Sequence, residues 1–154
     1  MRKSEFRVLI AYPNLSMMLT PSYAVGLFTA VLKEQGYEVQ LFDCTPYIAT
    51  HEFLKEPLPV TRANSLPGNS RQFDAEALFG APKTDLQRDF ANEVKEFKPH
   101  AIIFATLVED TWPQVKELLK VIKNFPDISH IAGGVFCKSA PEMAIAENIM
   151  QCIG

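Results

Sequence analysis

Gly133 and Gly134 form a glycine pair directly after the apolar residues 130–132. Because glycine has no Cβ, such a pair at the end of a strand lets the backbone approach a ligand closely. Ser139 then supplies a hydroxyl shortly before Pro141, and proline is common in the first turn of a helix. The spacing predicts a buried strand, a glycine-containing loop and a helix, the ligand-facing half of a parallel α/β unit. A plain tight turn at the glycine pair is the competing interpretation.

Two earlier loops also carry groups that can bind a ligand. One begins at Pro13 and Asn14 and the other ends at Thr111, and each follows a near-continuous apolar run. Such runs are typical of strands buried on both faces of a parallel sheet. Because parallel strands end at one edge, we expect the loops that follow them to surround one site. These loops are residues 13–23, 106–111 and 133–139.

A helix is expected between the first two strands. Thr20 and Pro21 predict its start, and Gly36 predicts its end. Gly26 lies inside this helix, where glycine costs about 1 kcal/mol relative to alanine. That cost indicates a close approach, either to a packed strand or to a flat ligand. The apolar residues of the helix recur with helical spacing and predict one inward face: Tyr23, Leu27, Phe28, Val31 and Leu32.

The rest of the chain alternates between strand and helix patterns. Strands are expected at residues 37–42 and 150–153, and helices begin at Thr84 and at Trp112. The helix from Trp112 should turn four apolar residues inward: Val115, Leu118, Leu119 and Ile122. A last helix should carry Met143, Ile145 and Ile149.

This order predicts a doubly wound α/β fold, flavodoxin-like or Rossmann-like, with a five-stranded parallel sheet of order 2-1-3-4-5. Residues 1–154 are expected to form a single domain. Residues 44–83 lack periodicity and contain many prolines and glycines. They are expected to be a long insertion after the second strand, either a lid over the edge of the sheet or a disordered excursion.

The composition excludes several classes of function. At 47% hydrophobic and 21% charged residues the chain is an ordinary globular one, and its net charge of −3 argues against a nucleic-acid partner. No signal sequence and no apolar stretch long enough for a membrane span is present. Cys44, Cys137 and Cys152 are odd in number and lack disulfide, zinc or iron–sulfur spacing. The expected compartment is therefore the cytoplasm.

The sequence motifs that bind other cofactors of this fold class are absent from this chain. The first loop has no G-x-G-x-x-G, so nothing cradles a dinucleotide pyrophosphate, and Asp43 is expected to be solvated rather than a ribose ligand. The same loop lacks the hydroxyl- and glycine-rich cradle of a flavin binder. No acidic pair follows the first strand, as a phosphoacceptor receiver domain would require.

An ordered set of segments resembles the N-terminal cobalamin-binding domain of cobalamin-dependent radical S-adenosylmethionine (SAM) enzymes. The resemblance covers nearly the whole chain except the insertion. It implies a flat corrin macrocycle on the sheet edge, above small residues, with its nucleotide tail in a slot between strands. The segments that carry it are residues 7–13, 24–27, 36–39 before Asp43, 98–103, Gly133-Gly134 and Pro141-Glu142.

The chain departs from that family at several places. Val135 and Phe136 stand where the family often has Pro-His, and Ala105 and Thr106 where it often has a Ser-containing motif. No D-x-H-x-x-G is present in the first loop, so the resemblance implies a corrin held without a histidine from that loop and no protein ligand to the metal. The cluster motif C-x-x-x-C-x-x-C and the radical barrel are also absent, so this chain alone should not be catalytic.

The resemblance implies cobalamin as the cofactor, with SAM and a 4Fe–4S cluster only in a partner domain, in cis or in trans. Methyl transfer or a related radical reaction is the activity expected of the full-length protein. A regulatory or interaction domain that keeps the fold but has lost the cofactor is the alternative. The residues expected to line the cofactor are Pro13, Asn14, Leu15, Tyr23, Gly26, Thr106, Leu107, Thr111, Gly133, Gly134, Val135, Phe136 and Ser139.

Overall fold

The fold is built around a strand that is buried on both sides. In the computed structural model, which describes residues 3–14, 22–47, 83–105, 109–146, 149 and 151–153, residues 8–11 of this strand are all buried. The strands are β1 (Arg7–Tyr12), β2 (Glu38–Asp43), β3 (Ala101–Phe104), β4 (Ser129–Gly133) and β5 (Gln151–Ile153). The helices are α1 (Tyr23–Glu34), α3 (Leu86–Phe97), α4 (Trp112–Ile122), α5 (Val135–Ser139) and α6 (Pro141–Ala146), with 3-10 turns η1 (Lys3–Glu5) and η3 (Glu109–Thr111).

The sheet is parallel, and its order reverses beside β1. β2 pairs with one edge of β1, β3 with the other, and β4 with β3, which gives the order β2-β1-β3-β4. This confirms the prediction of a parallel, helix-flanked sheet with the order 2-1-3-4. The short β5 segment runs parallel to β4 and pairs Gly133 with Ile153.

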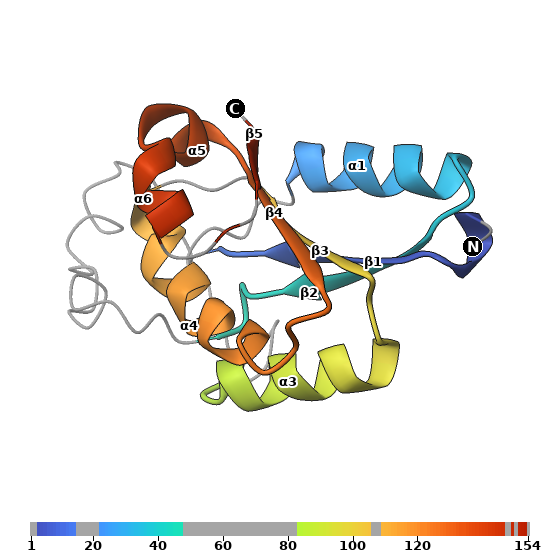
Figure 1. The fold of residues 1–154 in the computed structure, drawn as a ribbon, viewed down its shortest axis with the longest axis horizontal. Coiled ribbons are helices and arrows are strands. Elements are labelled where there is room, and N and C mark those ends of the chain that lie inside the picture. The colour runs from blue at the N-terminus through green and yellow to red at the C-terminus, as the bar shows by residue number, and fades with distance from the viewer. Residues whose placement is uncertain are drawn as a thin grey trace, which may run out of the picture.

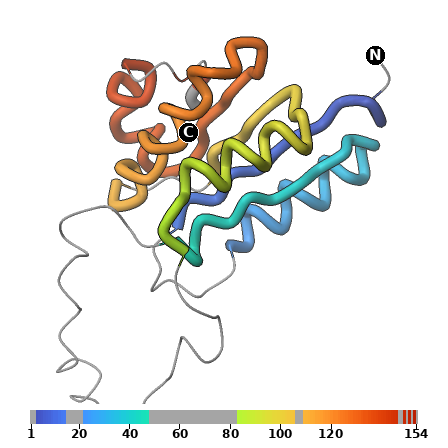
Figure 2. Tube along the Cα trace, turned by 90° about the horizontal axis from the view of Figure 1, so that it is seen from below, coloured from blue at the N-terminus to red at the C-terminus, as the bar shows by residue number. Residues whose placement is uncertain are grey.

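The two faces of the sheet are covered unequally (Figure 1). Leu9 and Ala11 of β1 face a large core that includes buried residues of α3, α4, α5 and α6. Val8 and Ile10 face the opposite side, where the buried cluster is small and contains only Val25 from α1. Figure 2 shows α1 and α3 on opposite sides of the first two strands.

The larger core confirms the predicted inward face of α4. Its four predicted residues are buried together with Trp112, whose ring stacks on Phe136 of α5 at a centroid distance of 4.7 Å. On α3, Leu86, Phe90 and Val94 are buried, and the Phe90 ring lies 5.0 Å from that of Phe42 in β2. Aromatic contacts of this kind contribute beyond the area that they bury.

The predicted inward face of α1 is wrong. Four of its five residues are largely exposed, with exposed fractions of 84% for Tyr23, 49% for Leu27, 48% for Phe28 and 47% for Val31. The helix is apolar on nearly every side, so helical spacing alone cannot identify the side that meets the sheet. The helix also begins later than predicted, because the side-chain oxygen of Ser22 accepts a hydrogen bond from the Val25 N–H.

Two other helix boundaries differ from the predictions. The cap of α3 is Asp85 rather than Thr84, because its carboxylate accepts the Arg88 N–H at 3.1 Å. The predicted loop 133–139 is largely helical, since α5 begins directly after Gly134. The predicted last helix is the short α6, on which Met143 and Ile145 are exposed.

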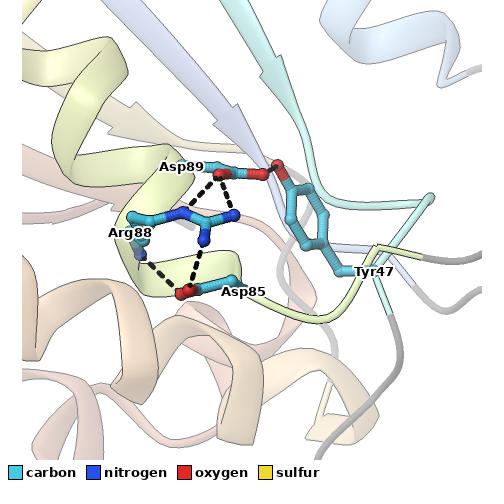
Figure 3. A network of polar contacts seen from close by, with 4 residues as sticks. All are labelled: Tyr47, Asp85, Arg88 and Asp89. Carbon is cyan, nitrogen blue, oxygen red and sulfur yellow. Dashed lines mark hydrogen bonds and ion pairs between the residues drawn. The ribbon is translucent and has the colours of Figure 1, made fainter.

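The chain closes on itself near the two ends of the predicted insertion, and Tyr47 there joins a network of polar contacts with α3 (Figure 3). Residues 48–82 lie outside the described residues, but Tyr47 and Lys83 on either side form a parallel bridge, and the Lys83 N–H donates to the Pro46 carbonyl at 2.8 Å. The Tyr47 hydroxyl donates to Asp89 Oδ2 at 3.1 Å, and Arg88 holds the other oxygen of that carboxylate. Burial, followed by this bond to Asp89, raises the pKa of Tyr47, so the phenol remains a donor.

No helix within the described ranges has the length and apolar character needed to cross a membrane.

We predict that residues 48–82 can be replaced by a flexible linker of about eight residues without loss of the fold, because the contacts at Tyr47 and Lys83 already close the chain there. The shorter loop should raise the free energy of unfolding by about 1 kcal/mol. Far-UV circular dichroism and a thermal melt measure both effects. A product without a cooperative melt would contradict the prediction.

Candidate functional site

Two of the predicted site segments lie at the carboxyl edge of the sheet. β1 leads into Pro13 and Asn14, which are both buried, and β4 ends in the glycine pair. β1 has β2 on one side and β3 on the other, so the reversal of strand order lies beside it. Ligands of doubly wound folds bind at this place. Leu15, Thr106 and Leu107 lie outside the described residues.

Asn14 is held from two directions by Gln114 and Thr45. Its backbone N–H donates to Gln114 Oε1 at 2.8 Å, and its side-chain Nδ2 donates to Thr45 Oγ1 at 2.9 Å. Gln114 is itself buried, and its Nε2 donates to the Cys44 carbonyl at 3.4 Å. One side chain of α4 therefore connects the chain that follows β1 to the chain that follows β2.

Gln114 was not among the predicted site residues, although a polar residue at its position in the helix indicates a buried polar contact. It lies on the inward side of α4, beside Val115 and Leu118, where the other residues are apolar. A buried amide costs free energy unless its groups are hydrogen-bonded. An amide in an apolar stripe thus indicates a buried polar contact, but the sequence does not show which backbone groups it meets.

Asp43 has a structural role at the end of β2. Its Oδ1 accepts hydrogen bonds from the Thr45 N–H at 2.8 Å and from the Thr45 hydroxyl at 2.6 Å. A carboxylate that accepts the N–H two residues ahead makes an Asx turn, which ends the strand. The same Thr45 hydroxyl accepts from Asn14, so the three side chains form one chain of hydrogen bonds.

The pKa values of two side chains near this edge, Tyr12 and Cys44, are raised. Burial raises the pKa of the Cys44 thiol, and the charge of Asp43 raises it further. The same two causes raise the pKa of the Tyr12 phenol. Both shifts favour the protonated forms of these two groups at neutral pH.

The two glycines of the pair have different roles. Gly134 has φ 130° and ψ −178°, a conformation that is essentially restricted to glycine, and it caps α5. Gly133 has no such constraint, and a Cβ placed on it would meet only the Ile153 carbonyl oxygen within 4 Å, at 3.5 Å. The backbone conformation therefore requires glycine at Gly134, while Gly133 leaves space above the sheet.

That space continues along a row of apolar side chains on the α1 side of the sheet. This apolar row consists of Ile103, Ile131 and Ile153. Ile103 of β3 and Ile131 of β4 are paired neighbours in register and are only half-buried. Gly133 and Ile153 are paired neighbours at the carboxyl edge, and Ile153 is 56% exposed. α1 packs over β2 and β1, so this row lies beside the helix rather than beneath it.

Other predicted site residues lie apart from this row. Tyr23 is almost fully exposed on α1, and the space around Gly26 is open, since a Cβ there would meet nothing within 4 Å. The expected close approach at Gly26 to a packed strand is therefore wrong. Thr111 is buried and precedes the first turn of α4.

The residues after the glycine pair either pack in the core or form part of helix α5. Phe136 is buried against Trp112, which gives it a core role, whereas Val135 is 69% exposed. Ser139 ends α5 rather than capping α6, and its hydroxyl donates to the Val135 carbonyl at 3.0 Å. A contact of these three residues with a cofactor stays a prediction.

The two described histidines lie at the amino end of the sheet. His100 Nδ1 accepts the Arg7 N–H at 3.0 Å, and its ring stacks on Phe6. His130 Nδ1 lies 3.4 Å from the Ile128 carbonyl oxygen. His51 is outside the described residues. Within the described ranges, no three His, Cys, Asp or Glu side chains come together as a metal site would require.

Solved structures that share this fold include a radical SAM methyltransferase and a cobalamin-binding protein. TsrM, a radical SAM methyltransferase from Kitasatospora setae determined with tryptophan substrate and a SAM analogue, superposes with a TM-score of 0.59 at 16% identity, over 93% of this chain and 22% of that one. A cobalamin-binding protein from Desulfitobacterium hafniense DCB-2 superposes with a TM-score of 0.55 at 13% identity, over 96% of this chain and 52% of that one. The chain thus spans about a fifth and about half of their lengths.

At these identities the likeness shows the fold alone. No known family model and no curated protein sequence matches the chain.

We predict that Gln114→Leu lowers the free energy of unfolding by about 1–3 kcal/mol, because it leaves the Asn14 N–H and the Cys44 carbonyl without this partner. Gln87→Leu is the matched control, since Gln87 is exposed on α3 and should change stability by less than about 0.5 kcal/mol. Denaturant titration of both variants measures the difference. Equal effects would show that the buried amide does not hold this edge together.

Proposed function

We propose that this chain is a corrinoid-binding module. The observation that carries the proposal is the half-buried apolar row on the α1 side of the sheet, which ends at the side-chain-free position Gly133. The likeness to a cobalamin-binding protein and to a radical SAM methyltransferase supports it. We also propose that the sheet is flavodoxin-like, with five strands in the order 2-1-3-4-5.

The residues present suit a large flat ligand with an apolar tail. A macrocycle needs a surface without projecting side chains, and Gly133 supplies one where a Cβ would point into the space above the sheet. The base of the nucleotide tail needs apolar walls, which Ile103 and Ile131 offer beside α1. Asn14, fixed by Gln114, would border the ligand at the point where the strand order reverses.

In the full-length protein we propose that this module works with a radical SAM domain, in cis or in trans. A bound corrinoid supplies a carrier for a methyl group, and the partner domain would hold SAM and the 4Fe–4S cluster. The role of this chain is to bind and orient the corrinoid and to exclude water from one of its faces. The buried thiol of Cys44, which forms no disulfide, suits a reducing compartment, which we take to be the cytoplasm.

We predict that cobalamin binds to the isolated chain and that Gly133→Leu weakens binding at least about tenfold while shifting the thermal melt little. A side chain at this position would fill the space next to Ile153 and the apolar row. Gly133 is the better site for this test than Gly134, because a substitution at φ 130° would strain the backbone of α5 by about 1–3 kcal/mol. Visible absorption during a cobalamin titration measures affinity.

The matched control is Ser129→Leu. Ser129 is an exposed residue on the same strand and the same face as Gly133, but it lies at the amino end of β4. Its leucine variant should bind cobalamin as the unmodified chain does. Absence of binding to the unmodified chain would contradict the proposal and favour a domain that keeps the fold without the cofactor. Equal losses in both variants would contradict the proposed location.

We further predict that no imidazole of this chain binds the cobalt. His100 and His130 lie at the amino end of the sheet, about a strand length from the proposed site. Electron paramagnetic resonance of the Co(II) form should therefore show no nitrogen splitting from a protein ligand. Splitting that disappears in His51→Ala would identify His51 as a ligand and contradict the prediction.

A further inference from the structure

The orientation of the Asn14 side-chain amide is fixed by two residues at the end of β2. Asp43 Oδ1 accepts both the Thr45 N–H at 2.8 Å and the Thr45 hydroxyl at 2.6 Å. A carboxylate only accepts hydrogen bonds, and a hydroxyl has a single proton to donate. The Thr45 oxygen is therefore left as an acceptor, and Asn14 Nδ2 donates to it at 2.9 Å. The amide nitrogen of Asn14 thus faces Thr45, and its oxygen faces away from Thr45.

The backbone of Asn14 is held by the same group of contacts. Its N–H donates to Gln114 Oε1 at 2.8 Å, and Gln114 Nε2 donates to the Cys44 carbonyl at 3.4 Å. Because Cys44 directly precedes Thr45, these contacts close a ring that fixes both the backbone and the side chain of Asn14. The amide cannot turn over without breaking a bond of this network. The chain that follows β1 therefore presents a carbonyl oxygen in a fixed direction.

We propose that the Asn14 side-chain oxygen accepts a hydrogen bond from a propionamide side chain of the corrinoid. Asp43 and Thr45 are then positioning residues that make the site select an amide at this place. This inference rests on the proposed function. Cobalamin carries its propionamides on the face of the corrin that also carries the nucleotide tail. With the tail beside the apolar row, that face meets the edge of the sheet where Asn14 follows β1.

The fixed oxygen of Asn14 discriminates between an amide and a carboxylate. A propionamide can donate an N–H to it, whereas a carboxylate has only acceptors and would meet it with no proton between the two oxygens. Asn14 is buried, so water does not relieve the mismatch. A mismatch of this kind weakens binding at least about tenfold. The site should therefore reject a corrinoid that carries a carboxylate in place of this one propionamide.

The isomeric monocarboxylic acids of cobalamin test the proposal with the full chain. Each isomer has one carboxylate in place of a different propionamide, so all of them carry the same charge. Isothermal titration calorimetry should show one isomer binding at least about tenfold more weakly than the others. Thr45→Val removes the partner that fixes the amide, so the isomers should then bind about equally. Thr45→Ser keeps the hydroxyl and should keep the discrimination. Thr84→Val, at an exposed threonine outside the network, is the matched control and should also keep it.

Asp43→Asn tests the positioning role by a second route. An amide at this position donates as well as accepts, so the Thr45 hydroxyl can donate to Asn14 and let its amide turn over. This variant should lose the discrimination too, and circular dichroism checks the fold of each variant. Equal affinities of the isomers for the unmodified chain would overturn this inference and leave the proposed function standing. Discrimination that survives in Thr45→Val would also overturn it. Failure of cobalamin and all the isomers to bind would overturn the proposed function as well.

Discussion

The burial of β1 on both faces is the constraint from which the other features follow. A strand in the middle of a parallel sheet must be covered on both sides, because its side chains alternate between two apolar faces. On one side Leu9 and Ala11 meet a core built from four helices. On the other side Val8 and Ile10 meet a thin layer formed by α1. The unequal cover leaves apolar side chains of α1 exposed on the thinly covered side.

The polar groups at the carboxyl edge impose a second constraint. When β1 and β2 end, their backbone groups leave the sheet but stay buried, and buried N–H and C=O groups need partners. Gln114 supplies both kinds of partner, as an acceptor for Asn14 and a donor for Cys44. The Asx turn of Asp43 fixes the neighbouring Thr45. These contacts make the edge rigid at the place where a doubly wound fold binds its ligand, which lowers the ordering cost of binding.

The sequence correctly predicted the elements whose apolar residues follow one clear pattern. The apolar runs of β1 and β3 can be satisfied only by two-sided burial, and α4 has one clearly apolar side, so both were predicted correctly. α1 was not, because an almost uniformly apolar helix has no polar side to mark its outward face. Ser139 was misplaced for another reason: a hydroxyl before a proline resembles a cap, but Gly134 had already started a helix that Ser139 ends.

The candidate site was harder to predict than the fold, because it depends on contacts between segments distant in sequence. The glycine pair was visible, yet its division into a strained Gly134 and an unconstrained Gly133 depends on the position of Ile153 and the start of α5. Gln114 lies 100 positions from Asn14, so no local pattern could pair them.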